Sequence, residues 1–340
     1  MSIPKDSPES ILDDIWKWAQ TYKMRINEEN KSLWYLTDEF GSKIRHSGDA
    51  NFVMVPFFCQ YYGYSISLLF PKRNCKLMEE IARDYSYGEK DPDNLRTCLY
   101  PWVQSKLSAS TVPSQKPLEY FEKVADKMEK TLPAIESFMI PFISVPEGTV
   151  KVYSEIKYVD DTLTDPRFQL VSEKSEADVL WLSREINDFN NQFDTGPGQL
   201  VNSIPCQYLM TVKADLAELA KRIKGQTWHP LTYDIHSELE NFIVEFERRE
   251  AESLNNVWIL KSWNAQRGAI TRVSKNLNQI IRHRETLHPY VIQKFITNQV
   301  QLKGKAFYYR YHFMIKSIEP IEAYVIDVVR GKPTENYLKN

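Results

Sequence analysis

Hydrophobic positions near the start of the chain recur with the spacing of a helix. Ser7 is a residue type that caps helix N-termini, and Pro8 suits the first helical turn. The apolar residues that follow at helical intervals are Ile11, Leu12, Ile15, Trp16 and Ala19. This pattern predicts an amphipathic helix at the N-terminus.

After Leu33 the pattern changes to short runs in which apolar residues alternate with smaller or polar ones, as in strands. The clearest run has apolar side chains at every second position, namely Tyr64, Ile66, Leu68 and Phe70. We therefore expect a small, mostly β domain over residues 1–103. Residues 104–148 begin with a Ser-rich stretch and continue with a helical stripe from Leu118 to Met128, which predicts a linker containing a helix.

From residue 149 onward, strand-like segments alternate with helical ones, which predicts an α/β or α+β domain. The strand-like segments are VKVYSEI, DVLWL, VWILK, YVIQKFI, FYYRYHFMI and EAYVIDVV. Thr211 is the expected cap of one helix, and Ser237 with Glu240 forms the pattern of a capping box for a second. A third helix is expected from about Ser274 to His283.

Composition limits the class of protein. Hydrophobic residues make up 42% and charged residues 26% of the 340 residues, which is typical of a folded globular chain. The formal net charge of -2 argues against a protein built to bind nucleic acid directly. We expect no secretion signal and no membrane span, because no run of about 18 apolar residues occurs. The four widely spaced cysteines indicate neither a zinc site nor a disulfide framework, which fits the cytosol or nucleus.

The densest chemical signal is VWILKSWNAQRGAI, in which an expected strand ends at Lys261 and a loop with Arg267 and Gly268 follows. Cationic side chains near a glycine, where a ligand can approach the backbone closely, suit phosphate oxygens. The alternative is a solvated lysine followed by an ordinary turn glycine.

A second candidate is YVIQKFI, which places Gln293 and Lys294 before Phe295 and Ile296. Such a strand can lie along a purine, with apolar groups on the ring and backbone groups at its edge. It can equally be an edge strand whose lysine prevents aggregation. Arg310, in the next strand-like segment, has a guanidinium that suits a terminal phosphate.

The order of these features resembles the ATP-grasp domain of the tubulin-tyrosine ligase family. The resemblance extends upstream through DVLWL, NSIPCQYLMTVKADL, HPLTYDI and WILKSW. DEFGSKIRHS, NFVMVPFF and EEIARDYSYGE resemble the SET-like domain that precedes the ligase-like domain in one branch of the family. The resemblance runs from about Ile11 to Val329. It implies a SET-like domain at 1–103, an ATP-grasp region at 149–330 that lacks its C-terminal part, and a divergent tail at 331–340.

The resemblance also assigns binding roles. Lys261 is expected at the ATP phosphates together with Arg267 and Gly268, Gln293 to Ile296 at the adenine, and Arg310 at the terminal phosphate. Lys213 is a weaker candidate for a second phosphate lysine. Active relatives have a proline where Ser262 stands, and a lysine and an aspartate where Ala306 and Tyr308 stand. Their acidic Mg²⁺ ligands would lie beyond residue 330, so we expect none here, little or no catalysis, and ATP bound weakly or not at all.

The SET-like resemblance does not imply a working methyltransferase. Residues 1–40 contain no glycine, and Arg45 replaces the asparagine of the Asn-His-Ser motif ahead of His46. Arg83 stands where an aromatic residue is usual, ahead of Tyr85. We expect structural roles for His46 and Tyr85 and no binding of S-adenosylmethionine. No catalytic triad or metal-ligand spacing is evident, and RHRE at 282–285 has the pattern of an exposed helix end.

These observations lead to one main hypothesis and two alternatives. The main hypothesis is a pseudoenzyme that binds tubulin and influences its tyrosination or detyrosination without catalysing it, in the cytoplasm with the cytoskeleton and also in the nucleus. Lys275, Arg282 and Arg284 would face the acidic C-terminal tail of tubulin. The first alternative is a truncated form of an active tubulin amino-acid ligase. The second is a chromatin factor related to SET methyltransferases, with histone or chromatin as partner.

Overall fold

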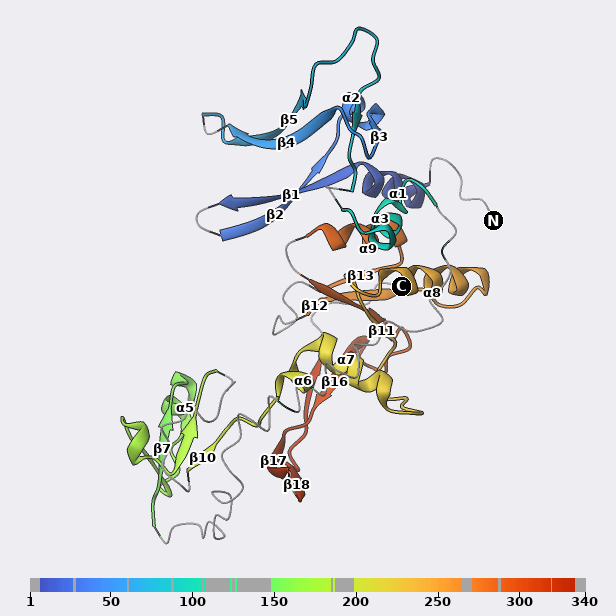
Figure 1. Ribbon diagram of the computed structural model, residues 1–340. Coiled ribbons are helices and arrows are strands. Elements are labelled where there is room, and N and C mark those ends of the chain that lie inside the picture. The colour runs from blue at the N-terminus through green and yellow to red at the C-terminus, as the bar shows by residue number, and fades with distance from the viewer. Residues whose placement is uncertain are drawn as a thin grey trace. The chain divides into compact units, whose positions relative to one another are not determined.

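The computed structural model describes residues 7–26, 29–59, 61–86, 89–104, 107, 123, 126, 148–184, 186, 199–263, 271–286, 289–318 and 320–333. Contacts divide the chain into two compact units, Met1–Gln293 and Lys294–Asn340. Helices and strands are mixed along the chain (Figure 1), which confirms the predicted α+β class. The linker residues 108–122 and 127–147 and the tail from 334 lie outside the described residues.

The N-terminal segment contains a helix followed by short strands. In order, its elements are α1 (Pro8–Trp18), β1 (Ala19–Ile26), β2 (Glu29–Leu36), α2 (Glu39–Lys43), β3 (Arg45–His46), β4 (Phe52–Cys59), β5 (Tyr64–Pro71), β6 (Ala82–Arg83) and α3 (Pro92–Leu99). Ser7 caps α1 by accepting a hydrogen bond from the Ser10 amide, as predicted. The helix ends one residue earlier than expected, because Ala19 already pairs with Leu36 as the first residue of β1.

The strands of this segment pair locally. β1 with β2 and β4 with β5 form antiparallel ribbons, whereas the short β3 and β6 pair in parallel. The alternating run from Tyr64 to Phe70 lies in β5 (Figure 1), which confirms the predicted strand.

A parallel sheet follows, with strand order β10-β9-β7-β8. Its elements are β7 (Val150–Ser154), α5 (Lys157–Thr162), β8 (Phe168–Leu170), the 3-10 helix η2 (Lys174–Glu176), β9 (Val179–Trp181) and β10 (Leu200–Val201). The predicted strands VKVYSEI and DVLWL are therefore confirmed as β7 and β9.

The main core lies around a second sheet, with strand order β11-β14-β12-β13. Its elements are α6 (Tyr208–Thr211), α7 (Lys213–Arg222), β11 (Thr232–Asp234), α8 (Leu239–Ala251), β12 (Trp258–Ser262), β13 (Thr271–Ser274), α9 (Leu277–Arg282), the 3-10 helix η3 (His283–Glu285) and β14 (Tyr290–Lys294). One stripe of α8 is buried, formed by Leu239, Phe242, Ile243 and Phe246. It packs with Trp258 of β12 and Ile292 of β14, and each such side chain contributes roughly 1.5–3 kcal/mol by burial.

Three predicted helix starts are wrong. Val212, not Thr211, precedes α7, because Thr211 ends the short helix α6. Ser237 does not cap α8; its hydroxyl donates to the Asp234 carboxylate instead, and Glu238 precedes the helix. The third helix begins at Leu277, because Ser274 belongs to β13, and Asn276 caps it by accepting from the Gln279 amide.

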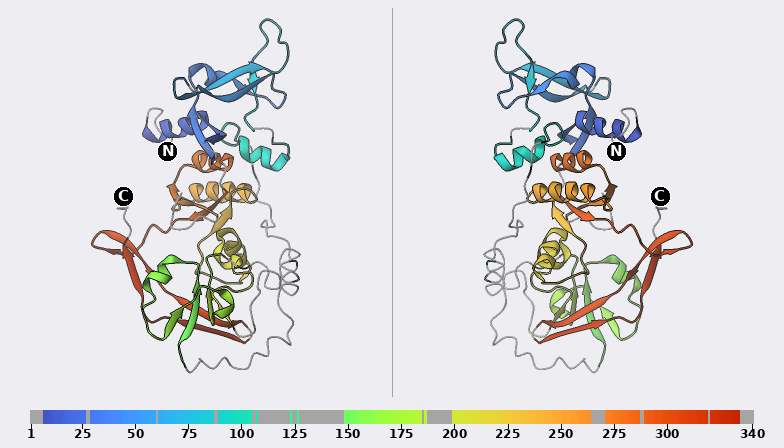
Figure 2. Two further views of the ribbon diagram at one scale, coloured as in Figure 1. Left: turned by 90° about the vertical axis from the view of Figure 1, so that its left-hand side faces the viewer. Right: turned by 90° about the vertical axis from the view of Figure 1, so that its right-hand side faces the viewer.

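Helix α9 joins the N-terminal segment to this core. Figure 2 shows α9 beside α1 and α3 in both views, and contacts connect these helices. Arg282 of α9 donates from Nη2 to the Ala19 carbonyl at 2.6 Å, just past the end of α1. Its guanidinium also lies 4.6 Å from the Trp102 ring centroid and forms an ion pair with Glu285 at 2.7 Å. The two segments therefore share one buried polar cluster.

The second unit consists of short antiparallel strands. They are β15 (Gln301–Leu302), β16 (Lys305–Arg310), β17 (Phe313–Ile318), β18 (Ile321–Val325) and β19 (Arg330–Pro333). The segment FYYRYHFMI is not one strand, because it divides into β16 and β17 at Tyr311 and His312. β16 pairs with β15 and β19, while β17 pairs with β18.

Candidate functional site

Lys261 lies near the end of β12, on the face of the strand that turns away from the core. Alternate residues Trp258, Leu260 and Ser262 are buried, so the strand period places Lys261 on the opposite side. Its ammonium donates to the Gln293 side-chain carbonyl at 2.6 Å. The structure therefore brings together two of the residues that the sequence predicts.

Gln293 is held in one orientation by a chain of hydrogen bonds. Its Nε2 donates to Thr232 Oγ1 at 2.9 Å, and the Thr232 hydroxyl donates to the Pro230 carbonyl at 2.8 Å. Because the hydroxyl proton is used on a backbone carbonyl, the Thr232 oxygen accepts from Gln293. The amide oxygen of Gln293 therefore faces Lys261. Antiparallel pairing of β11 with β14 places Thr232 directly opposite Gln293.

Lys213, at the first position of α7, is a charged neighbour of Lys261. Burial lowers the pKa of the Lys261 ammonium, and the positive charge of Lys213 lowers it further. Burial also lowers the pKa of Lys213. The Lys213 amide donates to the Trp263 carbonyl at 3.1 Å, which ties the start of α7 to the end of β12. Two partly desolvated ammonium groups thus lie close to one another.

His229 and Lys221 extend this positive region. Burial lowers the pKa of His229, and Lys261 and Lys221 add to that effect. Lys221 donates to both carboxylate oxygens of Glu238, at 2.6 and 2.7 Å. Burial raises the pKa of Glu238, and Lys221 opposes the rise. Lys221 is thereby neutralised locally.

Nothing that the structure describes brings the other predicted nucleotide-binding residues to Lys261 and Lys213. Arg267 and Gly268 lie outside the described residues. Lys294, Phe295, Ile296 and Arg310 belong to the second unit. The strand β14 ends at Lys294, so the expectation that Phe295 and Ile296 continue it is wrong. Arg310 is exposed on β16, opposite Arg330 of β19.

In the N-terminal segment, His46 and Tyr85 have structural contacts. The Tyr85 amide donates to His46 Nδ1 at 3.1 Å, and the buried Tyr85 hydroxyl donates to the Ile44 carbonyl. Burial raises the pKa of the Tyr85 hydroxyl. Arg83 of β6 pairs with His46 of β3, and its guanidinium lies 4.3 Å from the Tyr85 ring centroid. These contacts support the predicted structural reading of both residues.

The prediction that RHRE at 282–285 forms an exposed helix end is wrong. Arg282 and His283 are buried, and Arg284 donates to Cys98 Sγ at 2.7 Å and to Glu89 at 3.2 Å. Arg282 and Arg284 therefore do not face an external acidic tail. Lys275, which was predicted with them, is exposed.

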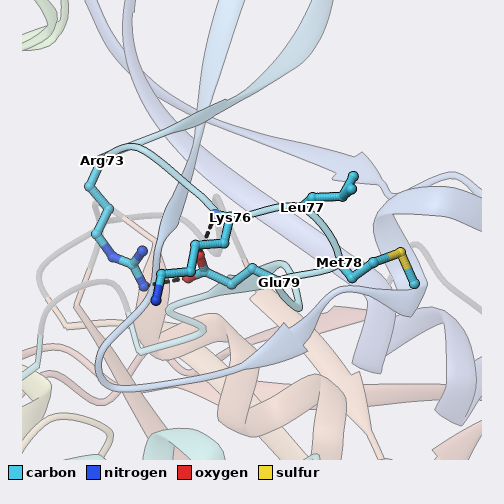
Figure 3. A pocket seen from close by; sticks show the side chains of 5 residues that line it. All are labelled: Arg73, Lys76, Leu77, Met78 and Glu79. Carbon is cyan, nitrogen blue, oxygen red and sulfur yellow. Dashed lines mark hydrogen bonds and ion pairs between the residues drawn. The ribbon is translucent and has the colours of Figure 1, made fainter.

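Sequence reasoning missed Thr232 and His229 as members of the site. Both lie in HPLTYDI, a segment that the sequence analysis matched to the family without giving these residues a role. The signal was the strand pairing of Thr232 with Gln293, which a single sequence does not show. A separate shallow pocket, lined by Arg73, Lys76, Leu77, Met78 and Glu79 (Figure 3), contains none of the predicted residues.

Among the described residues, no group of three or more His, Cys, Asp or Glu side chains is placed to hold a metal ion. Within the same part of the chain, no helix is both long and apolar enough to cross a membrane.

Comparison with protein families gives two matches, in the order that the sequence predicted. Residues 2–106 match the tubulin tyrosine ligase SET-like domain, and residues 191–329 match the tubulin-tyrosine ligase family. The second range contains Lys213, Lys261, Gln293 and Arg310. The chain belongs to the tubulin-tyrosine ligase family.

Curated relatives specify the branch of this family. Tubulin–tyrosine ligase-like protein 12 of Homo sapiens is 35% identical over 330 residues, which cover 94% of this chain and 50% of the human protein. The Mus musculus protein of the same name is 34% identical over 337 residues, which cover 95% of this chain and 52% of the mouse protein. The Caenorhabditis elegans protein of the same name is 28% identical over 340 residues, which cover 93% of this chain and 51% of the nematode protein. The chain spans about half the length of these relatives.

Proposed function

We propose that this chain is a pseudoenzyme that binds tubulin, influences its tyrosination or detyrosination without catalysing it, and keeps a phosphate subsite for nucleotide. The names of the relatives, which refer to tubulin–tyrosine ligase, support tubulin as the partner. The phosphate subsite is argued from the first compact unit alone, because Lys294 to Ile296 and Arg310 belong to the second.

The observation that carries the subsite is the juxtaposition of Lys261 with Lys213. Each ammonium is disfavoured by burial, and the charge of Lys213 adds to the penalty at Lys261. An anion that enters between them reverses both effects, because it supplies opposite charge and accepts hydrogen bonds. Triphosphate oxygens have the charge and acceptor number that suit this pair. When bound to an active ligase, ATP supplies the phosphoryl group that drives ligation.

Three differences from the pattern of active relatives support the absence of catalysis. Ser262, Ala306 and Tyr308 replace the proline, lysine and aspartate of the active pattern. Ala306 is buried and cannot contact a ligand through a charged group, and the Tyr308 hydroxyl cannot act as a carboxylate toward a cation. The chain would therefore hold phosphate without groups that ligation requires.

Calorimetry on the purified chain tests the phosphate subsite. ATP is titrated with and without Mg²⁺ into the wild type, Lys261→Ala and Lys224→Ala. Lys224 is an exposed lysine just after α7 and serves as the matched control. We expect binding to weaken at least tenfold in Lys261→Ala and to remain unchanged in Lys224→Ala. Equal ATP binding by all three chains, or no ATP binding by the wild type, would contradict the proposed phosphate subsite.

Tubulin binding is tested by co-sedimentation with microtubules. Intact microtubules are compared with microtubules whose acidic tails have been removed by protease, because Lys275, the exposed member of the predicted basic set, would face the tail. We expect binding to the intact form and a marked loss without tails. ATP-dependent incorporation of labelled tyrosine or glutamate into tubulin by the purified chain would contradict the pseudoenzyme proposal.

A further inference from the structure

The β4–β5 hairpin differs from the rest of the chain in charge. Residues 52–71 contain no Asp, Glu, Lys, Arg or His, although charged residues make up 26% of the whole sequence. Solvent-exposed antiparallel ribbons usually carry polar or charged side chains on the open face. An uncharged ribbon of this length therefore requires an explanation.

Large apolar side chains are exposed on this ribbon. The Tyr22 hydroxyl donates to Ser67 Oγ at 2.9 Å, so the face that carries Ser67 is directed toward β1. The opposite face, called here the outer face, carries Phe57 of β4 and Tyr64, Ile66, Leu68 and Phe70 of β5. Each of these five side chains is between 39% and 51% exposed. The outer face thus presents a row of large apolar side chains to solvent, and Phe58 on the opposite face is 53% exposed as well.

Strand pairing makes the outer face continuous. Phe57 lies opposite Ile66, and Val55 lies opposite Leu68. Directly opposed side chains on one face of an antiparallel pair touch each other, so these pairs form an unbroken apolar strip. A contiguous apolar surface of this kind marks an interaction site when it exceeds a few hundred square ångströms.

Tyrosines extend the strip at the tip of the hairpin. Gly63 turns the chain with φ of 68°, and Tyr61, two residues before it, is 88% exposed. The Tyr62 ring contacts Tyr61 at 4.8 Å and stacks on Tyr64 at 5.6 Å between centroids. Rings that support one another in this way form a rigid contact surface, which lowers the entropy lost on binding.

We propose that the outer face and the tyrosine tip bind the same surface of a second copy of this chain. The contact would be two-fold symmetric, with each hairpin lying against its partner. The five aromatic rings of this surface expose roughly 450–750 Å² if a fully exposed ring offers about 150–250 Å². With Ile66 and Leu68 added, the area approaches the roughly 800 Å² that each partner buries in a standard interface.

The charge pattern favours a second copy over a charged partner. Acidic or basic peptides gain affinity and specificity from opposite charge, and the hairpin offers none. A second copy meets no like-charge repulsion here and presents the same uncharged, aromatic surface. This inference is independent of the nucleotide site and of tubulin.

Sedimentation velocity of the full chain from about 1 to 100 µM tests the proposal. We expect the wild type to be a concentration-dependent dimer. Ile66→Lys places a charge in the centre of the outer face and should weaken the dimer at least a hundredfold. Leu77→Lys is the matched control, because Leu77 is 95% exposed and lies on the loop after β5, outside the outer face (Figure 3). It should dimerise like the wild type.

Hydrogen exchange on the wild type provides a test that needs no substitution. Amides of β4 and β5 should become more protected as concentration rises, whereas amides of α8, in the core, should not change. A wild type that stays monomeric at 100 µM, a dimer that Ile66→Lys leaves intact, or open-ended oligomers would each overturn the proposal.

Discussion

Arg282 Nη2 and the backbone carbonyl of Ala19 are joined by a hydrogen bond of 2.6 Å across 263 residues of sequence. Ala19 immediately follows α1, where helix carbonyls lack partners within the helix. The same guanidinium donates to Glu285 at 2.9 Å. One buried cation thus satisfies a helix end of the N-terminal segment and a carboxylate of η3.

Replacing Arg282 by Met should destabilise the first unit strongly. The change leaves the nearly buried Glu285 carboxylate without its partner, and loss of one partner of a buried ion pair costs about 3–5 kcal/mol. Urea unfolding, followed by tryptophan fluorescence, measures the free energy of unfolding. Arg248→Met is the control, because Arg248 forms half-exposed ion pairs on α8 that contribute about 0–1 kcal/mol. Similar midpoints for the two variants would contradict the assigned role of Arg282.

Thr232→Val should cost about 1–3 kcal/mol, because it removes a buried hydroxyl that both accepts from Gln293 and donates to Pro230. The variant should also let the Gln293 amide rotate, so that Lys261 loses its fixed acceptor and ATP affinity falls. Thermal unfolding and calorimetry measure the two effects. Thr271→Val, at an exposed position of the neighbouring β13, should change stability by no more than about 0.5 kcal/mol. Unchanged ATP affinity in Thr232→Val would argue that Gln293 orientation has no effect on the site.

The stability difference between Lys261→Met and the wild type should depend on pH. The folded-state pKa of Lys261 lies below its ordinary value of 10.5, so the unfolded chain binds more protons between the two values. Lys261 therefore contributes least to the free energy of unfolding at pH values below its folded-state pKa. This contribution to stability rises as pH increases toward 10.5. Lys261→Met should consequently be stabilised most near neutral pH, and this advantage should shrink as pH rises from the folded-state pKa of Lys261 toward 10.5.

Urea unfolding at several pH values between 7 and 10 measures that difference. Lys224→Met should show none of this pH dependence, because Lys224 is exposed. A difference between Lys261→Met and the wild type that stays constant over the whole range would show that burial does not perturb Lys261.

Cys98 should resist thiol reagents until the protein unfolds. Burial raises the pKa of its thiol to about 11, so the thiolate fraction at pH 8 is on the order of one in a thousand. Cys75 is exposed and should react first. Iodoacetamide labelling followed by peptide mass spectrometry distinguishes the two, with and without urea. Labelling of Cys98 at the same rate as Cys75 in native buffer would contradict the burial of Cys98.

Patterns that depend on neighbouring residues were predicted well. The stripe from Leu239 to Phe246 and the strand ending near Lys261 follow from periodicity alone, and both occur. Apart from the Ser7 cap of α1, helix starts were predicted poorly, because serine and threonine side chains also hydrogen-bond locally outside caps. Ser237 does so with Asp234.

The features that sequence reasoning missed depend on distant partners. Arg282 appeared to lie in an exposed charged run because its acceptors belong to residues 16–19. Thr232 was missed because its role arises from pairing with Gln293, 61 residues later. Lys261 and Gln293 were singled out in separate segments, and the structure joins their side chains, while their role at a nucleotide stays a prediction.

The contact between Arg282 and Ala19 has a consequence for synthesis on the ribosome. Ala19 emerges early, whereas Arg282 is added 263 residues later. At about 5–20 residues per second, the end of α1 waits roughly 13–50 s for its partner. During that interval the rings of Trp16 and Trp34 have no His283 to pack against. The nascent N-terminal segment should therefore depend on chaperones until translation passes α9.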